Sequence, residues 1–590
     1  MKTLESLDIF NTKNIEEIPE YTNNLTIRDY NSLKRATFDI ETDGIDPNSS
    51  NILLIGLLDI NKNEYKYFTN EAGEKEMLLA FNNYLYDNKY DILSGHNVFD
   101  FDIPFLINKA KLYNIQWFYF YQGKYETMVS GTSLFGKPIS IIPAYCRRYT
   151  SIVDTYLLVA ILDNVIRSLS SYSLKQSVLE LGLRKEMRTE LKPNEIIEFW
   201  QTNKDKVIEY LKYDLEDTAL LLDYLFPSYY YQKEYLSNLS YQDLYLFSTA
   251  KKWNYLISKH YKRKPYPDKK VKYEGGLVIV NPGIYLKPAK IDISSLYPHI
   301  MLNYRICSRK DKQQMALSIL KHITNERIRL KQKAKSGDFQ AKLRQGSLKI
   351  LINSLYGFYG TGGYEFNDMK AAELVCAYGR EILKFMLKTI EENRGIVIEA
   401  DTDGIIFKHD DPKALFNIVQ NSLPKGFSID LEWQAKAIYV PNKKNYVVIF
   451  EDGTIDRKGT KFRGREKTWI EKDFPIEYLT LLINNRKEAN NFYNRIYTAI
   501  KNETIDKSKI TATRAIRKNE VSLAHLGKPG EKVSFYIAEK EGPRGGITYY
   551  KTLTDPYSIR YYANQLEEIK TEIDMMFEKC NKQILSTIQR

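Results

Sequence analysis

The stretch AKIDISSLYPHIM, residues 289–301, places one carboxylate, Asp292, at the end of an apolar run. Two serines, a leucine and then Tyr297 and Pro298 follow directly. A buried strand has no use for a carboxylate, because burying an unpaired charge is costly. A site that holds a divalent cation, a triphosphate and a sugar could use all of these side chains. The stretch therefore predicts a strand that ends at such a site.

The composition is that of a folded protein with several domains. The chain has 590 residues, of which 43% are hydrophobic and 27% charged, and domains of about 100–200 residues are the norm. No stretch approaches the roughly 20 apolar residues that span a bilayer. The N-terminus has no apolar segment typical of a signal peptide. We therefore expect an intracellular protein with no membrane partner.

Charge is distributed unevenly along the chain. Residues 1–230 carry a net charge of −9 and the remainder +21, and within the remainder residues 305–349 carry +10. Such a concentration favours a polyanionic partner, although a solvated helix face would have the same signature. The four cysteines are far apart, without a C-x-x-C motif, which argues against zinc and iron–sulfur sites. Any metal should be held by carboxylates, which suits Mg²⁺ or Mn²⁺.

A second acidic segment lies downstream of Asp292. The stretch IVIEADTDGIIF, residues 396–407, reads as a β-hairpin whose tight turn contains Asp401 and Asp403. We expect this turn and Asp292 to meet over one pair of cations. Nucleotide addition needs such a site, since one metal lowers the pKa of a primer 3′-hydroxyl and the other binds the triphosphate.

A basic helix is predicted between these two segments. In LRQGSLKILINSLYGFYG, residues 343–360, the helical period places Lys349, Asn353 and Tyr356 on one face. That face would carry a cation that reaches phosphate, an amide and an aromatic ring. Gly357 would let the helix end closely against another surface.

A first acidic constellation lies in the N-terminal third. In TFDIETDG, Asp39 and Glu41 are two residues apart on a predicted strand, so both carboxylates share a face. Such acids repel each other unless a cation lies between them. In SGHNVFDFDIPFLI, Asp100 and Asp102 stand among aromatic and apolar residues, where an acid is costly unless it is paired or bound to a metal.

Two further acids belong to this region. In YLKYDLEDTALLL, Tyr213 and Asp217 are four residues apart and share a helix face. Asp154, in SIVDTYLL, is a supporting acid, a cap or an ordinary helix residue.

Taken together and in order, these segments resemble the motifs of B-family DNA polymerases. D-x-E, N-x-x-x-F-D and Y-x-x-x-D are similar to the three motifs of the proofreading exonuclease, and DISSLYP, KILINSLYG and ADTDG are similar to polymerase motifs A, B and C. YEGG resembles the linker between the exonuclease and polymerase regions, and KKNY resembles a motif that contacts the primer terminus. Two further segments resemble parts of the thumb, KGTKFRGREK and SKITATRAIRKN. The likeness covers about residues 35–570.

The resemblance implies a multidomain protein of the α/β and α+β classes. An RNase H-like 3′→5′ exonuclease domain would precede a right-hand polymerase with palm, fingers and thumb. The predicted divisions are an N-terminal segment 1–30, the exonuclease domain 31–229, a first palm part 230–304 with the linker at 273–276, the fingers 305–349, a second palm part 350–454 and the thumb 455–590.

The resemblance also assigns roles in the exonuclease site. Four carboxylates would hold two Mg²⁺ or Mn²⁺ ions: Asp39, Glu41, Asp102 and Asp217. Tyr213 would orient the attacking water. Asp102 is preferred to its rival Asp100, because FDIPF matches the family's run and Asn97 then stands at the expected spacing.

In the polymerase site the resemblance gives two metal ions to Asp292, Asp401 and Asp403. The residues that it implies for nucleotide binding are Ser294, Ser295 and Leu296 through their backbone N–H groups, Tyr297 beneath the deoxyribose, and Arg327, Lys331, Lys349, Asn353 and Tyr356. Lys349 would also protonate the departing pyrophosphate. Those implied for DNA binding are Tyr273, Gly275, Gly276, Gly357, Lys444, Tyr446, Lys458 and Arg514.

The chain also departs from the family's pattern. Glu399 stands where motif C commonly has tyrosine, and it either adds a carboxylate beside the metal site or points the other way. Only 57 residues separate Asp292 from Lys349, and 48 separate Asn353 from Asp401. These intervals leave no room for the inserts of protein-primed phage enzymes.

From these intervals we expect a nucleic-acid primer, no terminal protein, and fingers made of a short pair of antiparallel helices. We also expect a monomer that binds primer–template DNA and dNTPs, in the cytoplasm of a prokaryotic or phage-infected cell. The C-terminus does not indicate a sliding clamp.

Three alternative functions remain open. The chain could be a nuclease whose polymerase half only binds DNA, a non-catalytic DNA-binding scaffold, or a protein-primed replicase. The intact acids argue against the first two, and the short intervals argue against the third.

Overall fold

The computed structural model forms two compact units. Unit 1 comprises Met1–Thr12, Glu274–Ile300 and Val375–Arg590, and unit 2 comprises Lys13–Tyr273 and Met301–Leu374. The structure describes residues 7–23, 25–115, 121–122, 133–134, 137–138, 144–145, 150–166, 169, 171–186, 188, 191–463, 467–516, 527, 532–539, 547–550 and 556–588. Among these residues, none of the helices combines the length and the apolar character that crossing a membrane requires.

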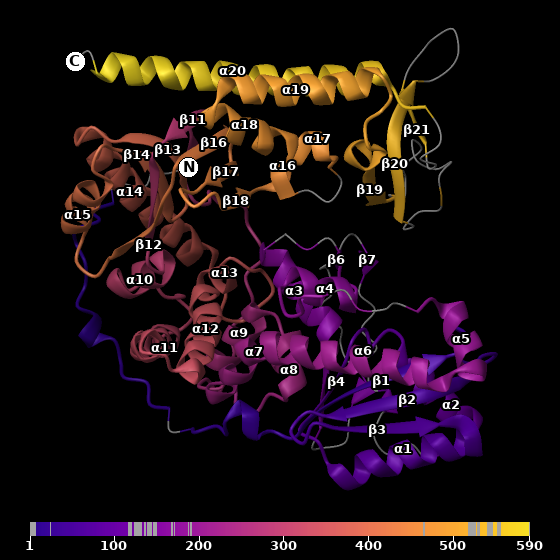
Figure 1. Cartoon of the computed structure of the whole chain (residues 1–590). Helices are drawn as coiled ribbons and strands as arrows, with labels where there is room; N and C mark the ends of the chain where they lie inside the picture. The colour runs from indigo at the N-terminus through magenta and orange to yellow at the C-terminus, as the bar shows by residue number, and fades with distance from the viewer. Residues whose placement is uncertain are drawn as a thin grey trace. The chain divides into compact units, whose positions relative to one another are not determined.

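A mixed five-stranded sheet in the order β3-β2-β1-β4-β9 forms the centre of the N-terminal part of unit 2 (Figure 1). Its strands are β1 (Arg35–Thr42), β2 (Ile52–Asp59), β3 (Glu64–Thr69), β4 (Ile92–Gly95) and β9 (Ser151–Asp154). β1, β2 and β3 pair antiparallel, whereas β1, β4 and β9 pair parallel. This mixed sheet agrees with the α/β fold predicted for the region.

Helices cover both faces of this sheet, which explains the continuous apolar run of β2. Ile55 packs in one core cluster with Phe81 of α1, and Leu54 packs in another with Leu211 of α6. Successive residues of a strand point to opposite faces, so β2 is buried on both sides. The helices of this part are α1 (Glu74–Asn88), α2 (Asp102–Leu112), α3 (Thr155–Ile166), α4 (Leu174–Glu180), α5 (Pro193–Thr202), α6 (Lys204–Leu225), α7 (Pro227–Tyr230), α8 (Tyr241–Leu246) and α9 (Thr249–Ser258).

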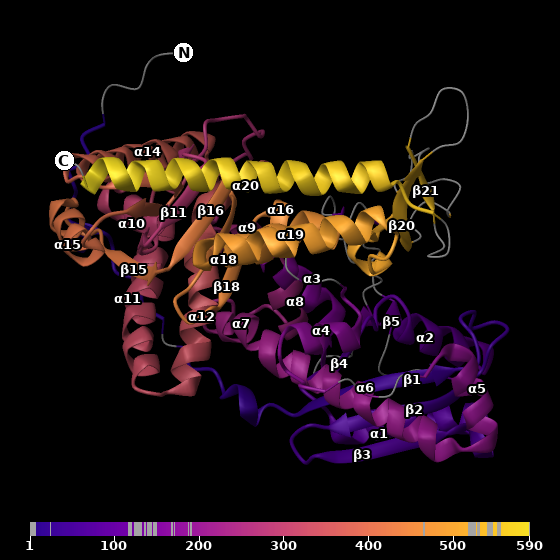
Figure 2. The same ribbon diagram turned by 45° about the horizontal axis from the view of Figure 1, so that its top comes forward.

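The basic region of unit 2 is a helical hairpin, as the sequence predicted. The helices α11 (Met315–Lys335) and α12 (Phe339–Asn353) lie side by side, and α13 (Leu355–Tyr359) follows (Figure 2). Asp338 begins α12 as its N-cap, because its carboxylate accepts the Ala341 N–H at 2.9 Å.

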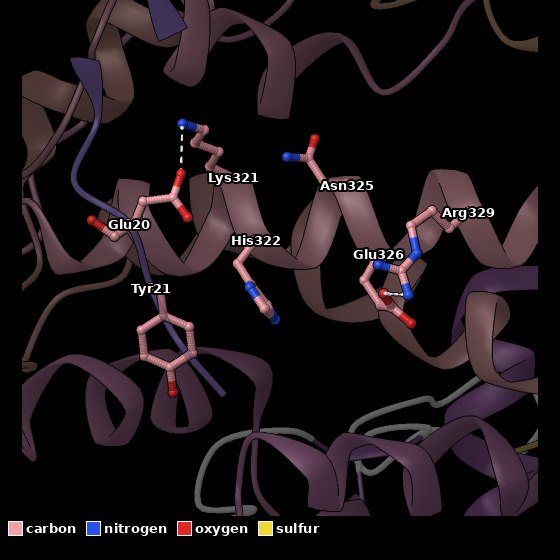
Figure 3. Close-up of a pocket in the computed structure, with 8 residues that line it drawn as sticks. Glu20, Tyr21, Lys321, His322, Asn325, Glu326 and Arg329 are labelled. Carbon is pink, nitrogen blue, oxygen red and sulfur yellow. Dashed lines mark ion pairs between the residues drawn. The ribbon is translucent and has the colours of Figure 1, made fainter. Parts of the chain in front are cut away.

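The N-terminal segment of unit 2 lies along α11 (Figure 3). The ammonium group of Lys321 pairs with Glu16 at 2.9 Å and with Glu20 at 3.5 Å. The Tyr21 ring meets the His322 ring edge to face at 5.6 Å. Because the Lys321 side chain is 7% exposed, these pairs hold the segment against the helix.

Two antiparallel sheets form the first part of unit 1. The first, in the order β10-β13-β14-β12-β15, contains β10 (Val278–Val280), β12 (Pro288–Ile293), β13 (Ile396–Asp401), β14 (Gly404–Lys408) and β15 (Ile429–Gln434). The second, in the order β11-β16-β17-β18, contains β11 (Gly283–Leu286), β16 (Ala437–Asn442), β17 (Asn445–Ile449) and β18 (Ile455–Lys458). Three helices accompany them, α10 (Leu296–Asn303), α14 (Met369–Glu392) and α15 (Pro412–Ser422).

The C-terminal part of unit 1 is mainly helical. Its elements are α16 (Thr460–Arg463), α17 (Trp469–Lys472), α18 (Phe474–Asn484), α19 (Arg486–Lys501), β19 (Ala512–Ala515), β20 (Lys532–Glu539), β21 (Ile547–Tyr550) and α20 (Ile559–Ile588). Among these elements, α18 and α19 follow each other directly as two separate helices. Asn485 separates them because its backbone is extended and its side chain accepts the Lys487 N–H at 3.0 Å.

Candidate active sites

Three carboxylates of unit 2 converge between β1 and α6. Asp39 and Glu41 lie on the face of β1 that also carries Thr37, whose hydroxyl donates to the Leu215 carbonyl of α6 at 3.1 Å. Asp214 of α6 completes the group, and ligand oxygens of Asp39, Glu41 and Asp214 all lie within 4.8 Å of one another.

Asp102 joins this cluster from the first turn of α2. Its carboxyl hydrogen bonds with that of Asp39 and accepts the Ile40 N–H at 3.3 Å. Asp102 is buried, whereas its rival Asp100 is exposed. The structure thus places Asp102 beside the two acids of β1.

Burial and mutual repulsion perturb these acids strongly. Burial raises the pKa of Asp39 well above its usual range, and the charges of Asp102 and Asp214 raise it further. Burial, followed by Asp214 and Asp102, raises the pKa of Glu41 to about 8. Burial raises the pKa of Asp102 to about 7. Hard oxygen ligands crowded in this way suit a divalent cation, because its charge relieves their repulsion.

The structure places Asp214 in this cluster, and not the predicted Asp217. Asp217 turns to two arginines, with Arg184 Nε at 2.7 Å and Arg188 Nε at 3.1 Å. Tyr213 lies beside the same arginines, whose guanidinium carbons are 5.4 and 5.8 Å from its ring centre. This packing corrects the expectation that Asp217 would hold the metal ions with the other acids and that Tyr213 would lie beside the attacking water.

The sequence contains a second, overlapping Tyr-x-x-x-Asp pattern that our prediction missed. It begins one helical turn earlier, at Tyr210, and ends at Asp214. Burial raises the pKa of Tyr210 far above its usual value, and the negative charges of Asp214 and Glu41 add to this effect. Lys175 of α4 donates to the Tyr210 hydroxyl at 3.1 Å.

Arg188 is the second cation at this site. It pairs with Asp214 as well as with Asp217, and both Lys175 and Arg188 lower the pKa of Glu41. The motifs gave no signal for these two basic residues.

Asp154 supports the loop that precedes Asp102. Its carboxylate accepts the backbone N–H of Asn97 at 2.9 Å and of Phe99 at 3.2 Å. Asn97 adopts a left-handed φ of 67°, which costs about 1–3 kcal/mol for most residues and needs such support. Of the three roles left open for Asp154, the structure shows a cap of backbone N–H groups.

In unit 1, strand pairing brings Asp292 beside the acidic hairpin. Asp292 of β12 pairs with Gly404 of β14, and the Ile293 N–H donates to the Asp403 carbonyl at 2.8 Å. A Cβ on Gly404 would lie 2.9 Å from Asp292 Oδ1. Glycine therefore leaves the space that this carboxylate occupies.

The turn of the hairpin is tight, as predicted. Asp401 pairs with Gly404, Thr402 has a φ of 62°, and the Asp403 N–H donates to the Asp401 carbonyl at 2.7 Å. Burial raises the pKa of Asp403; Lys290 lowers it and the charge of Asp401 raises it. These acids also fit a divalent cation, although Asp292, Asp401 and Asp403 do not form as tight a group as the three acids of unit 2.

Tyr297 is held between backbone elements of unit 1. A Cβ on Gly379 of α14 would lie 3.1 Å from Tyr297 Cε1, and one on Gly276 would lie 3.2 Å from its hydroxyl and 2.9 Å from Thr402 Oγ1. The hydroxyl is 3.9 Å from Cys376 Sγ. The backbone of Gly276 and Gly379 therefore confines the ring.

The backbone after Asp292 agrees only in part with a triphosphate site. The Ser294 N–H donates to the Ser428 carbonyl at 2.9 Å, so the predicted contact would require this bond to break. Ser295 has a φ of 52°, and Leu296 begins α10. The Ser294 hydroxyl donates to Asp430 at 2.6 Å.

The predicted nucleotide-binding residues of the helical hairpin lie in unit 2. Lys349 and Asn353 are both exposed on α12, while Arg327 of α11 is half-buried and Lys331 is exposed. Gly357 lies within α13, and the space around the position of its Cβ is open. The expectation that Gly357 ends a helix closely against another surface is corrected.

The predicted linker tyrosine, Tyr273, meets this hairpin's end. Its hydroxyl lies 3.1 Å from the hydroxyl of Tyr356 of α13. A Cβ on Gly360 would lie 2.3 Å from the same hydroxyl. Gly360 therefore leaves room for the tyrosine, and Gly275 further along the linker has open space around it.

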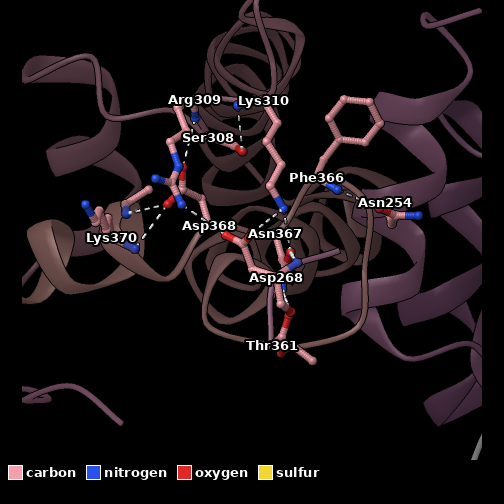
Figure 4. Close-up of polar contacts among 11 residues, drawn as sticks. Asn254, Asp268, Ser308, Arg309, Lys310, Thr361, Phe366, Asn367, Asp368 and Lys370 are labelled. Carbon is pink, nitrogen blue, oxygen red and sulfur yellow. Dashed lines mark hydrogen bonds and ion pairs between the residues drawn. The ribbon is translucent and has the colours of Figure 1, made fainter. Parts of the chain in front are cut away.

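A polar network anchors the chain that leads to Tyr273 (Figure 4). The Asp268 N–H donates to the side chain of Asn367 at 2.9 Å, and the Asn367 amide donates to the Asp268 carbonyl at 3.0 Å. The carboxylate of Asp268 pairs with Lys310 at 3.0 Å and with Arg309 at 3.3 Å. Asn367 is fully buried, so the anchor is rigid.

The remaining predicted DNA-binding residues lie in unit 1. Lys444 is in the β16–β17 turn, and its ammonium group lies 2.9 Å from Asp401 Oδ1. Tyr446 is buried and pairs with the exposed Lys458 of β18. Arg514 of β19 lies over the Phe535 ring at 5.7 Å. Part of each predicted thumb segment, residues 464–466 and 517–519, lies outside the described residues.

Comparison with known proteins identifies the family. The model of the exonuclease domain of DNA polymerase family B matches residues 6–176, and the model of DNA polymerase family B matches residues 308–528. A DNA polymerase of Pyrococcus glycovorans is 25% identical over 90% of this chain and 77% of its own length. One of Thermococcus sp. (strain 9oN-7) is 24% identical with the same coverage.

A solved structure has the same fold. The family B DNA polymerase of Pyrobaculum calidifontis aligns with 92% of this chain and 78% of its own chain, with a TM-score of 0.65 at 19% identity. The resemblance predicted from the motifs is therefore confirmed, as is the order of an exonuclease domain followed by a polymerase domain. This chain belongs to DNA polymerase family B and carries the exonuclease domain of that family.

Proposed function

We propose that the protein extends a nucleic-acid primer on a DNA template with dNTPs, and removes mismatched 3′ ends with its 3′→5′ exonuclease, during DNA replication. The observation that supports this most is the group formed by Asp39, Glu41 and Asp214, whose ligand oxygens lie within 4.8 Å of one another. The pairing of Asp292 with the hairpin of Asp401 and Asp403 in the other unit supports a second site.

In the exonuclease site, four acids would hold two Mg²⁺ or Mn²⁺ ions: Asp39, Glu41, Asp102 and Asp214. Tyr210 then takes the role that we predicted for Tyr213. Its hydroxyl receives a hydrogen bond from Lys175, so its own proton is available to orient a water molecule. Asp154 keeps the loop before Asp102 in place.

In the polymerase site, Asp292, Asp401 and Asp403 would hold the second pair of ions. Bound divalent ions lower the pKa of the attacking hydroxyl or water and stabilise the leaving oxygen. Lys349 would donate a proton to the departing pyrophosphate. Tyr297 would exclude a 2′-hydroxyl, because the backbone of Gly276 and Gly379 confines its ring.

Other residues would bind the nucleotide and the DNA. For the nucleotide these are Arg327, Lys331, Asn353 and Tyr356, with the backbone of Ser295 and Leu296. For the DNA these are Tyr273, Gly275, Gly276, Gly357, Lys444, Tyr446, Lys458 and Arg514. Cationic side chains that neutralise phosphates release counterions, so binding should weaken steeply as salt increases.

The domain divisions and partners predicted from the sequence complete the proposal. The exonuclease domain would be residues 31–229, the fingers 305–349 and the thumb 455–590, with the palm in two parts. The enzyme would act as a monomer in the cytoplasm of a prokaryotic or phage-infected cell, without a terminal protein; the sequence does not indicate a sliding clamp.

One experiment tests both activities. A 5′-labelled primer annealed to a template is incubated with Mg²⁺, with and without dNTPs. We expect extension in the first reaction and 3′→5′ shortening in the second. Asp403→Asn should abolish only extension, and Asp214→Asn only shortening. Shortening without extension by the wild type would instead support a nuclease, and transfer of a dNTP to a protein would support protein priming.

A further inference from the structure

Glu399 is a buried carboxylate close to the polymerase acids. It lies on β13, two residues before Asp401, and is 3% exposed. Its Oε1 accepts the backbone N–H of Lys444 at 2.9 Å. Its Oε2 is buried without a hydrogen-bond partner among the described residues. Burying a carboxylate costs folding free energy. We therefore expect a function in the hydrogen bond that Glu399 accepts from the Lys444 N–H.

Lys444 occupies a strained turn that depends on outside support. The turn joins β16 to β17, where Asn442 pairs with Asn445, and Lys444 has a left-handed φ of 61°. This conformation costs about 1 kcal/mol or more for a residue with a side chain. On its other side the turn meets Gly459, where a Cβ would lie 2.2 Å from the Lys444 carbonyl. Glu399 and Gly459 therefore hold the Lys444 peptide groups from both sides.

The turn in this conformation directs the Lys444 ammonium group to Asp401. The Nζ–Oδ1 distance is 2.9 Å, and the lysine side chain remains 54% exposed. A salt bridge of this exposure is weak, so a phosphate can compete for the ammonium group. The backbone contact with Glu399 is buried and does not involve the ammonium group.

We propose that Glu399 is a positioning residue of the polymerase site, which fixes the Lys444 backbone while the Lys444 side chain exchanges Asp401 for a phosphodiester of the primer strand. The proposal rests on the proposed polymerase function. A fixed backbone reduces the conformational entropy that the lysine loses when it binds the phosphate. Glu399 thus acts through Lys444 and does not itself touch the substrate.

The test compares Glu399→Ala with Glu399→Gln. Glutamine keeps an oxygen that accepts the Lys444 N–H, whereas alanine removes the acceptor. We expect E399A to raise the KM for primer–template about 10-fold, the size expected for a lost hydrogen bond to a charged group. The kcat should change less than about 3-fold, because Lys444 binds the ground state and the transition state alike. E399Q should restore the wild-type KM. Glu451→Ala, in an exposed turn of the same unit, is the matched control.

A double-mutant cycle with Lys444→Ala separates positioning from a general structural role. If Glu399 acts through Lys444, E399A should add nothing to the defect of K444A. Multiplied defects, or an unchanged KM in E399A, would overturn the proposal. So would an equal loss of exonuclease activity on single-stranded DNA, which would indicate general damage to the fold.

Hydrogen exchange makes the inference testable apart from activity. The Lys444 amide should exchange at least about 10-fold faster in E399A than in the wild type and E399Q, and unchanged exchange would refute the contact. Absence of primer extension by the wild type would refute the polymerase function instead. The two failures are therefore distinguishable.

Discussion

Two isosteric substitutions on α6 distinguish the two overlapping Tyr-x-x-x-Asp patterns. Asp214→Asn removes a charge from the group with Asp39 and Glu41. Asp217→Asn removes a charge that lies outside this group and pairs with Arg184 and Arg188, of which Arg188 also pairs with Asp214. We expect D214N to slow the exonuclease reaction strongly and D217N to reduce stability while the activity survives.

The size of each effect follows from these contacts. The ligand oxygens lie within 4.8 Å of one another, so a cation held among them would be no farther than this from Asp214. At that distance and an effective dielectric constant of about 20, two opposite unit charges attract each other by about 3.5 kcal/mol. If Asp214 contributes an interaction of this size to transition-state stabilisation, D214N should slow hydrolysis about 10²–10³-fold, because each 1.36 kcal/mol is tenfold in rate. D217N breaks a buried ion pair, which costs about 3 kcal/mol of unfolding free energy, but leaves the cluster of Asp39, Glu41 and Asp214 intact.

The assay is release of nucleotides from a 5′-labelled single strand under single-turnover conditions with Mg²⁺. Thermal unfolding is recorded for each variant, and primer extension serves as an internal control because its acids lie in the other unit. D214N should lose hydrolysis and keep extension, and D217N should keep hydrolysis within about 10-fold of the wild type below its melting temperature. Equal loss of hydrolysis in both variants, without a stability change in D217N, would refute the placement of Asp214.

Three further predictions concern titration, the sugar and the palm backbone. With metal ions removed by a chelator, burial and neighbouring acids raise the pKa of Glu41 to about 8. The contribution of Glu41 to stability is therefore complete below about pH 4.5 and is lost as the pH rises to about 8. Thermal melts should show this loss of stability in the wild type and less of it in Glu41→Gln, and parallel curves for the two proteins would contradict the prediction. Tyr297→Val should raise ribonucleotide incorporation about 10–100-fold in competition assays, since it removes the ring that lies against Gly276 and Gly379. Unchanged selectivity would reject Tyr297 as the residue that excludes the 2′-hydroxyl. Gly404→Ala places a Cβ 2.9 Å from Asp292 Oδ1, so the carboxylate must shift and extension should slow at least about 10-fold. The measurement is the rate of single-nucleotide incorporation, and a normal rate would argue against this contact.

Local patterns in the sequence were enough to predict several elements of both candidate sites. The period of two on β1 places Asp39 and Glu41 on one face. The Asp–Gly turn predicts the hairpin of Asp401 and Gly404. These predictions succeeded because strand alternation and turn conformation depend on residues that are close in the chain.

The choice between Asp214 and Asp217 could not be made in this way. Both acids end a Tyr-x-x-x-Asp pattern on one helix, and both are buried. Only the packing of α6 against β1 and the position of Arg184, which pairs with Asp217, determine which acid meets the acidic cluster. The backbone-capping role of Asp154 likewise depends on a loop more than 50 residues earlier in the chain.

The sequence by itself determined the family and the order of the exonuclease and polymerase domains, and it predicted most of the acids that the structure brings together, because short motifs with fixed spacing carry this information. Tertiary structure alone decided which acid of α6 joins the cluster, that Lys175 and Arg188 accompany it, and that Glu399 holds the Lys444 turn. The physical reason is that a side chain's partners depend on how distant elements pack, whereas a motif records only neighbours along the chain.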